Sequence, residues 1–547
     1  MSSVGDRAAV PRPYVMVVVL FCALVLSGCS ALELPWTDRG PTPPPTTPSG
    51  PPSSATPSSG GTTSPTPTPA TPTVARSTAP IPDVLPEGFR QPPPGNGLSR
   101  YTEQEVDWQN CGQRLECAEI AVPLDHDDPD GVAITLAVKR YDGGSGTQGS
   151  IFLNPGGPGG SGYSMPDSYG QFFAGEFDTI GWDPRGVGRS TPVKCFNGAD
   201  LEKFYELDST PDDETEEREL AEGTRAFTMS CLALSGRLLE HVSTVETVKD
   251  LDLMRRVVGD EKLTYLGFSY GTEIGAVYAQ LFPQHVGRLV LDSAVNITQN
   301  ASIIQAQGFD RALGNFAQWC ADGNCEFGNS ADAVITRITD FLDDLDANPL
   351  PVGDRELTQS LGALGVLTPL YQDERVWPYL RTALGQAFAG DGSMLLRYAD
   401  SYNRRDADGQ YGQMLFAFNA VRCLDEGDGG LAGAEQEAAE AAAKAPVFGT
   451  HLGPDLMCAM WPVPAREPVG KITGPGAPPI LVVGTTGDSA TPYEYAEWMA
   501  AQLESGVLLT LDGEGHGAFG GPSACINDAV LTYLTTGRTP PEGTVCR

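Results

Sequence analysis

Positive charge and histidine are both scarce in this sequence. Its 547 residues include 35 Lys and Arg against 70 Asp and Glu, which gives a formal net charge of −35, and there are 5 His. Proteins that bind nucleic acid present basic surface to the phosphates, so this balance excludes nucleic acid as a partner. The balance favours a cationic substrate, such as a peptide with a free amino terminus. The alternative interpretation is that acids spread along the chain only keep an exported protein in solution.

Metal-binding patterns are absent as well. No two cysteines form a C-x-x-C pair, and no cysteine lies near a histidine at zinc-finger spacing. His126 lies among acids in the segment 125–131, where an exposed turn is a better interpretation than a metal ligand. We therefore expect neither a metal nor a cofactor.

The amino-terminal apolar run, Val15–Leu26, is shorter than the about 20 residues that cross a membrane comfortably. It predicts a secretory signal peptide over residues 1–28. The run ends in Leu-Ser-Gly before Cys29, which resembles the bacterial lipobox, where the cysteine thiol is acylated. We expect an extracytoplasmic protein anchored to the membrane lipid through Cys29. The alternative is plain secretion after cleavage near Gly28.

Residues 29–96 are predicted to form a disordered tether. From Pro41 to Pro82 the sequence is nearly all Pro, Thr, Ser, Gly and Ala, so it cannot bury enough apolar surface to fold. Proline extends such a segment into a spacer, and its hydroxyl groups are suited to O-glycosylation. A lipid-anchored enzyme needs a tether of this kind, which supports acylation of Cys29.

The cysteines predict a set of disulfides. Two of the 12, Cys22 and Cys29, lie near the amino terminus, and an even number remains in a chain that we expect to be exported. Sequence does not fix their connectivity. Pairing of neighbours is the working assumption, because each pair closes a short or moderate loop and stabilises the fold by ~2–4 kcal/mol. The assumed pairs are Cys111–Cys117, Cys195–Cys231, Cys320–Cys325, Cys423–Cys458 and Cys525–Cys546.

The segment Lys262–Tyr278 combines a strand, a sharp turn and a helix. Leu263–Phe268 is a short apolar run typical of a buried strand, and apolar side chains recur at helical spacing after the turn. Between them lies Gly267-Phe-Ser-Tyr-Gly271, the G-x-S-x-G pattern. We predict that Ser269 is a nucleophile held above a sheet, at the positive end of the following helix.

Alternating strands and helices predict the α/β class, with a mostly parallel sheet after an opening hairpin. The predicted strands are 117–124, 132–141, 150–154, 177–182, 263–268, 287–292, 479–484 and 506–511. Helical patterns dominate the middle of the chain, so we expect a helical cap inserted between two parts of the core. The predicted cap helices are 310–320, 331–345, 361–370, 377–389, 394–402 and 432–445. The predicted boundaries are 97–297 and 468–547 for the core and 298–467 for the cap.

A serine hydroxyl needs a base to take its proton. In a sheet of this kind the chain order is serine, acid, histidine, which removes His126 and His241. His285 directly follows the predicted nucleophile helix, and His451 lies in the cap with no strand before it. His516 lies on a glycine-rich loop straight after a predicted strand, so we predict that it is the base.

The acid that orients the base is predicted to be Asp488, just past the strand 479–484. Asp292 and Asp512 are the alternatives. Strand ends at the carboxyl edge are where such sheets place their sites. At the same edge, the glycine-rich loop Pro155–Gly162 follows a buried strand and is suited to supply one N–H donor of an oxyanion hole.

These motifs together resemble a family: the exported tripeptidyl-aminopeptidase-like α/β-hydrolases of high-GC Gram-positive bacteria, relatives of proline iminopeptidase. The resemblance covers about residues 105–547. The motifs that carry it are Asn154-Pro-Gly-Gly-Pro-Gly159, Trp182-Asp-Pro-Arg-Gly186, Gly267-Phe-Ser-Tyr-Gly-Thr272, Val421-Arg-Cys-Leu-Asp425, Gly484-Thr-Thr-Gly-Asp488 and Gly515-His-Gly517. The closing cysteines also fit the family's carboxyl-terminal module.

The resemblance implies an α/β-hydrolase fold with a helical cap and a cell-surface serine aminopeptidase. Such an enzyme releases short peptides, with tripeptides as the family's implied product, from free amino termini through an acyl-enzyme. The resemblance assigns the catalytic triad to Ser269, Asp488 and His516. It assigns the oxyanion donors to the N–H groups of Gly157 and Tyr270. Proline iminopeptidases have His-Gly-Gly-Pro-Gly where this chain has Asn-Pro before the glycines, so their strict specificity is not expected here.

Two other functions are considered beside the peptidase. A carboxylesterase or lipase would need the same triad, and a non-catalytic binding protein would have lost it. For the peptidase, cap carboxylates would pair with the substrate's ammonium, with Asp373, Glu374 and Asp425 as candidates. Glu273, one turn after the serine, is interpreted as an ordinary helix surface residue.

Overall fold

The computed structural model describes residues 80–82, 84, 88–427 and 429–547. The predicted signal peptide, the acylation of Cys29 and most of the predicted tether lie outside the described residues. The last part of the tether segment, residues 88–96, is described. There Arg90 exchanges two backbone hydrogen bonds with Ala133, at 2.9 and 3.1 Å. No helix in the described ranges is long and apolar enough to span a membrane.

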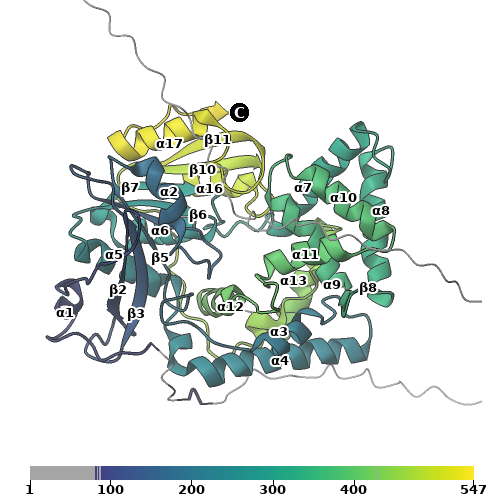
Figure 1. Ribbon diagram of the computed structural model, residues 1–547, viewed down its shortest axis with the longest axis horizontal. Helices are drawn as coiled ribbons and strands as arrows, with labels where there is room; N and C mark the ends of the chain where they lie inside the picture. The colour runs from purple at the N-terminus through teal and green to yellow at the C-terminus, as the bar shows by residue number, and fades with distance from the viewer. Residues whose placement is uncertain (1–79, 83, 85–87, 428) are drawn as a thin grey trace, which may run out of the picture. The chain divides into compact units, whose positions relative to one another are not determined.

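The described part of the chain is built on a ten-stranded sheet (Figure 1). Its first strands form an antiparallel meander, and the strands from β4 onward that build the rest of the sheet run parallel. In spatial order the strands are β1 (Gln109–Gly112), β2 (Leu115–Pro123), β3 (Ala133–Tyr141), β5 (Asp178–Trp182), β4 (Ser150–Asn154), β6 (Leu263–Phe268), β7 (Val286–Asp292), β10 (Ile480–Gly487), β11 (Gly506–Glu514) and β12 (Val545–Cys546). The predicted fold class, a mostly parallel α/β sheet, is confirmed.

The central parallel strands are mostly buried, as expected where helices cover both faces of the sheet. Phe152 of β4 packs in one core with α5 (Thr244–Val257) and α6 (Tyr270–Leu281). Its neighbours Ile151 and Leu153 point to the other face and pack in a second core. That second core includes side chains of α2 (Met165–Phe173) and α17 (Ala524–Thr536). Helix α16 (Tyr493–Gln502) joins the first core.

A third core belongs to the helices between β7 and β10. The helices of this region are α7 (Gln305–Asp322), α8 (Ala331–Ala347), α9 (Gln359–Leu367), α10 (Trp377–Phe388), α11 (Ser393–Tyr402), α12 (Met414–Asp425), α13 (Gly430–Lys444), α14 (Phe448–His451) and α15 (Leu456–Ala459). The small hairpin of β8 (Leu350–Val352) and β9 (Arg355–Leu357) also lies here. The sequence did not predict α12, whose buried side chains pack in the first core rather than in the third.

The polar segment 196–235 is partly buried. Its helices α3 (Gly198–Tyr205) and α4 (Glu214–Ser235) bury one face, including Phe227. Phe227 stacks on Phe204 of α3 and packs against Phe416 of α12, which explains its burial. Polar contacts also join the segment to the cap, because Glu202 accepts a hydrogen bond from Arg405 and Ser209 donates its N–H to Ser360. These helices therefore form a support beneath part of the cap.

Five disulfides connect the described cysteines, in the pairs that neighbour pairing predicts. Cys423–Cys458 links α12 to α15, and Cys525–Cys546 links α17 to the last strand. Cys195–Cys231 is buried and ties the segment after β5 to α4.

Loop length should decide what each disulfide contributes to stability. Cys195→Ala with Cys231→Ala opens a bridge with a sequence separation of 36 and should lower the free energy of unfolding by about 4 kcal/mol. Cys111→Ala with Cys117→Ala opens a bridge with a separation of 6 and should cost about 2 kcal/mol. Urea unfolding measures both, and equal losses would contradict the chain-entropy explanation.

Candidate active site

Ser269 occupies the turn between β6 and α6 with a left-handed backbone, φ 55° and ψ −129°. The turn requires glycine on both sides. A Cβ on Gly267 would lie 2.3 Å from the carbonyl oxygen of Gly271, and one on Gly271 would lie 2.9 Å from Oδ1 of Asn154. These are the collisions that the G-x-S-x-G pattern avoids.

Hydrogen bonds on both sides of the serine hold this conformation. Ser269 donates its N–H to the carbonyl oxygen of Asp292 at 3.0 Å. Its own carbonyl accepts the N–H of Thr272 at 2.8 Å and the Thr272 hydroxyl at 2.6 Å. The peptide groups of the turn are thereby fixed before any ligand arrives.

His516 and Asp488 are in direct contact. Nδ1 of His516 lies 2.9 and 3.1 Å from the two carboxylate oxygens of Asp488. Asp488 is 1% exposed, and its Oδ1 accepts the N–H groups of Ala490 and Thr491 at 3.0 and 2.8 Å. The Thr491 hydroxyl donates to Oδ2 at 3.0 Å and lies 3.3 Å from His516 Nδ1. The carboxylate is thus fixed, and it fixes the ring.

The charge around His516 favours its protonated form. Burial lowers the pKa of His516, but the carboxylate of Asp488 and then that of Asp292 outweigh burial and leave the pKa above its ordinary value. An imidazole next to such carboxylates is suited to accept a proton and hold it during a reaction.

The loops of Ser269 and His516 meet at Asp292, the last residue of β7. Phe268 is paired with Asp292 in the parallel ladder, and Ser269 binds the Asp292 carbonyl. On the other side, the Asp292 carboxylate accepts the N–H groups of Ala518 at 3.1 and 3.2 Å and of Phe519 at 2.7 Å. The structure therefore brings the three predicted triad residues to one edge of the sheet.

The glycine-rich loop after β4 lies against the serine turn. A Cβ on Gly156 would lie 2.9 Å from both the Ser269 Cβ and the Tyr270 nitrogen. Gly156 itself donates its N–H to Oδ1 of Asn154 at 2.8 Å, so that group is occupied. The next N–H along the loop is that of Gly157, the predicted partner of Tyr270. Asn154 is 1% exposed and holds the loop in place, a role that the sequence did not reveal.

Acidic side chains gather beside Tyr270. The Tyr270 hydroxyl and the Asp425 carboxylate both bind the Thr244 hydroxyl, and Asp425 also accepts the Thr244 N–H at 2.9 Å. Burial and then the charge of Asp425 raise the pKa of Glu273 to about 8. Burial likewise raises the pKa of Asp425 to about 6. Glu273 is thus half-buried beside a second acid, which differs from the surface position that we expected.

The other two candidates for ammonium binding are less suited. Asp373 forms a two-pronged ion pair with Arg375, so its charge is already compensated. Glu374 is exposed. Asp425 alone of the three lies beside the serine turn, and the motif Val421–Asp425 was the sequence signal that pointed to it.

The remaining histidines have structural partners. His285 contacts Asp252 at 3.0 Å and stacks on Phe282. His451 is buried and lies 2.7 Å from the Val447 carbonyl oxygen. His126 is 8% exposed and contacts Asp250 at 2.8 Å, which corrects the expected exposed turn.

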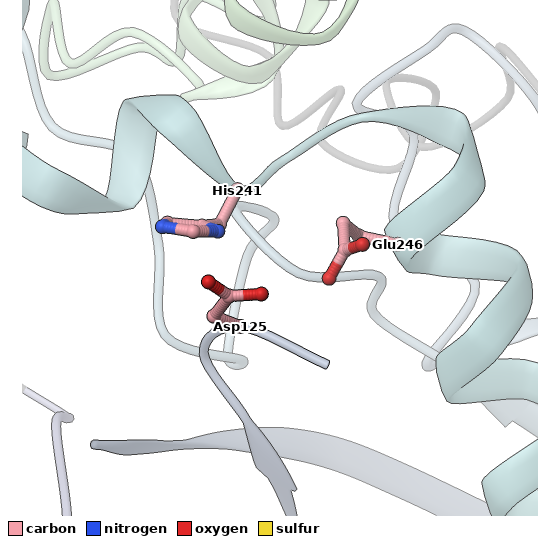
Figure 2. Close-up of side chains that lie close together, drawn as sticks. All are labelled: Asp125, His241 and Glu246. Carbon is pink, nitrogen blue, oxygen red and sulfur yellow. The ribbon is translucent and has the colours of Figure 1, made fainter. Parts of the chain in front are cut away.

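Within the described residues, Asp125, His241 and Glu246 form a group that could hold a metal ion (Figure 2). In Figure 2 the ring of His241 and the carboxylate of Glu246 both face Asp125. Cations of the protein already surround the group: Lys249 binds Glu246 at 2.9 Å, and the buried guanidinium of Arg185 lies 3.6 Å from Glu246. Because these charges compensate the acids, we interpret the group as an ion-pair network that fixes the Arg185 motif.

The fold and the site geometry define an α/β-hydrolase. The family model described as TAP-like protein matches residues 445–546. Serine protease Hip1 of Mycobacterium tuberculosis (strain ATCC 25618 / H37Rv) is 36% identical over 487 residues, covering 82% of this chain and 93% of that protein. Tripeptidyl aminopeptidase of Streptomyces lividans is 32% identical over 479 residues, covering 82% and 88%. Carboxylesterase B of M. tuberculosis (strain ATCC 25618 / H37Rv) is 32% identical over 472 residues, covering 81% and 90%.

The chain belongs to the tripeptidyl-aminopeptidase-like (TAP-like) family of α/β-hydrolases. The resemblance drawn from its motifs is confirmed, and the protein is a serine hydrolase.

The left-handed backbone at Ser269 predicts an unusual order of stability. Ser269→Gly should be more stable than Ser269→Ala by about 1 kcal/mol, because glycine adopts φ 55° without a Cβ penalty. Urea unfolding of the two variants, which both lack the hydroxyl, measures the difference. An alanine variant at least as stable as the glycine variant would contradict strain at this turn.

Proposed function

We propose that the protein is a cell-surface serine aminopeptidase that releases short peptides from free amino termini through an acyl-enzyme. Ser269 attacks the scissile carbonyl while His516 takes its proton, and Asp488 keeps the imidazole oriented. His516 then passes the proton to the leaving amine, and water releases the acyl group. The single observation that carries the proposal is the contact between Asp488 and His516 at the sheet edge where Ser269 adopts its left-handed turn.

The N–H groups of Tyr270 and Gly157 are proposed as the oxyanion donors. Tyr270 begins α6, whose amino-terminal end is partially positive. Each such donor contributes about 3 kcal/mol to the transition state in enzymes of this kind. The close approach of Gly156 to the Tyr270 nitrogen supports a shared oxyanion position for the two loops.

The acids beside Tyr270 support a substrate with a positive amino terminus. Burial disfavours the charged forms of Glu273 and Asp425, so a cation that binds there relieves the cost of ionising them. An ammonium group bound by these acids would lie beside Tyr270, the residue after the proposed nucleophile. The names of two relatives, serine protease and tripeptidyl aminopeptidase, agree with this substrate class.

Ester hydrolysis is the second candidate, because one relative is named carboxylesterase B and the triad does not distinguish esters from amides. Cleavage of tripeptidyl and aminoacyl chromogenic amides, compared with simple acyl esters, separates the two functions. The peptidase requires kcat/KM on a tripeptidyl amide to depend on the free amine. Ester hydrolysis without amide cleavage would overturn it.

Labelling should depend on one hydroxyl. We expect a fluorophosphonate probe to label the wild-type protein and Ser269→Ala to abolish labelling, with peptide release lowered by at least about 10⁴-fold. Ser145→Ala, which changes an exposed serine on a surface loop and leaves the proposed nucleophile intact, is the control that should still be labelled. Labelling that persists in Ser269→Ala would show a different nucleophile.

Glu273 should affect the hydrolysis only of substrates that have a free amino terminus. Glu273→Gln should lower kcat/KM for a tripeptidyl amide about tenfold, equivalent to about 1.4 kcal/mol, and leave the N-acetylated peptide unchanged. Glu435→Gln, an exposed glutamate on α13, is the matched control. Equal effects on both substrates would place the function of Glu273 elsewhere.

Anchoring and domain roles complete the proposal. We propose that residues 1–28 are a signal peptide, that Cys29 is acylated and that residues 29–96 tether the enzyme, with 298–467 as a cap over a core of 97–297 and 468–547. Metabolic labelling with a fatty acid, lost in Cys29→Ala, tests the anchor. A protein released from cells without any label would support plain secretion instead.

A further inference from the structure

Asp292 is a fully buried carboxylate without a cationic side chain bound to it in the described part of the chain. It is 0% exposed. The titratable or charged groups that face it are His516, Asp488 and the Tyr169 hydroxyl. An isolated buried charge is costly, so a carboxylate kept in such a place usually has a function.

The carboxylate is held by the loop that carries the base. It accepts three hydrogen bonds from the N–H groups of Ala518 and Phe519, the second and third residues after His516. Ser293, which directly follows Asp292 and β7, accepts the N–H of Gly517 through its hydroxyl at 2.7 Å. The loop after His516 is therefore fixed at three consecutive peptide groups by two adjacent residues.

The same residue holds the nucleophile through its main chain. The Asp292 carbonyl accepts the Ser269 N–H at 3.0 Å, so one residue contacts both loops. Asp292 thus connects the loop of His516, through its side chain, with the serine turn, through its backbone.

We propose that Asp292 is a positioning residue for His516: it fixes the loop of the base and supplies a second negative charge that favours the imidazolium. The inference rests on the proposed role of His516 as the general base. Asp488 contacts the ring directly, whereas Asp292 acts through the loop and through the electric field. Burial raises the pKa of Asp292 to about 6, against the backbone hydrogen bonds that lower it.

The ionisation of Asp292 opposes folding stability at neutral pH. Because its pKa in the folded protein lies above the ordinary value, the folded state binds more protons than the unfolded chain between about pH 4 and 6. Its contribution to stability is therefore present below pH 4 and lost as pH rises through about 6. A charge that is kept despite this cost fits a role in activity better than a role in stability.

The pH profile of kcat/KM separates a charge effect from a packing effect. The acidic limb reports deprotonation of the free base. In Asp292→Asn we expect kcat/KM at pH 8 to fall about tenfold or more, and the acidic limb to move to lower pH by about 0.5 to 1 unit, because a negative charge near His516 is lost. KM should change less than about twofold, since Asp292 is not expected to touch the substrate.

Two matched variants separate the charge from the loop contacts. Ser293→Ala removes the neutral hydroxyl that accepts the N–H of Gly517 in the same loop. It should lower activity without moving the acidic limb of the pH profile. Asp512→Asn removes an exposed acid on β11 that pairs with Arg547, so neither activity nor the limb should change. A limb that stays in place in Asp292→Asn, or moves equally in Asp512→Asn, overturns the proposal.

A second variant covers the case in which Asp292→Asn does not fold. Asp292→Ser is the second neutral variant, and it should show the same shift of the limb if Asp292→Asn does not fold. Failure of both neutral variants to fold, while Asp292→Glu folds, would show a structural role and overturn the proposal. The profile is measured on whichever amide or ester the wild type hydrolyses, after Ser269→Ala has been shown to abolish labelling. Failure of the peptidase function is thus distinguishable from failure of this inference.

Discussion

The left-handed backbone of Ser269 is the constraint on which the active site depends. A serine with φ 55° is held in place only because glycines flank the turn and because the Asp292 and Thr272 groups bind its peptide atoms. In the proposed mechanism, this turn presents the hydroxyl above the sheet and the start of α6 supplies an N–H to the oxyanion. Strain at the turn is thus part of how the nucleophile is presented.

Residues of the cap contact the loop that carries His516. His516 donates its N–H to the Tyr371 carbonyl at 2.9 Å, and its ring packs against the Tyr371 ring at 5.6 Å. Asn315 of α7 donates to Glu514, two residues before His516, at 2.8 Å. Two segments of the cap therefore hold the loop that carries His516.

Sequence patterns predicted the sheet and most of the helices between β7 and β10, because each depends on local signals. An apolar run followed by glycines, as at Ser269, can be recognised without distant contacts. The contacts of Asp292, Asn154 and Glu273 could not be predicted, because each arises where segments far apart in the chain meet. Glu273 looked like a helix surface residue until α12 placed Asp425 beside it. Helix α12 itself was missed.

The covalent adduct of the enzyme with a fluorophosphonate tests the central claim most directly. A crystal structure of that adduct should show phosphorus bonded to Oγ of Ser269. The phosphoryl oxygen should lie about 2.7–3.1 Å from the backbone nitrogens of Tyr270 and Gly157. Phosphorus on another side chain, or a phosphoryl oxygen that points away from both nitrogens, would contradict the account.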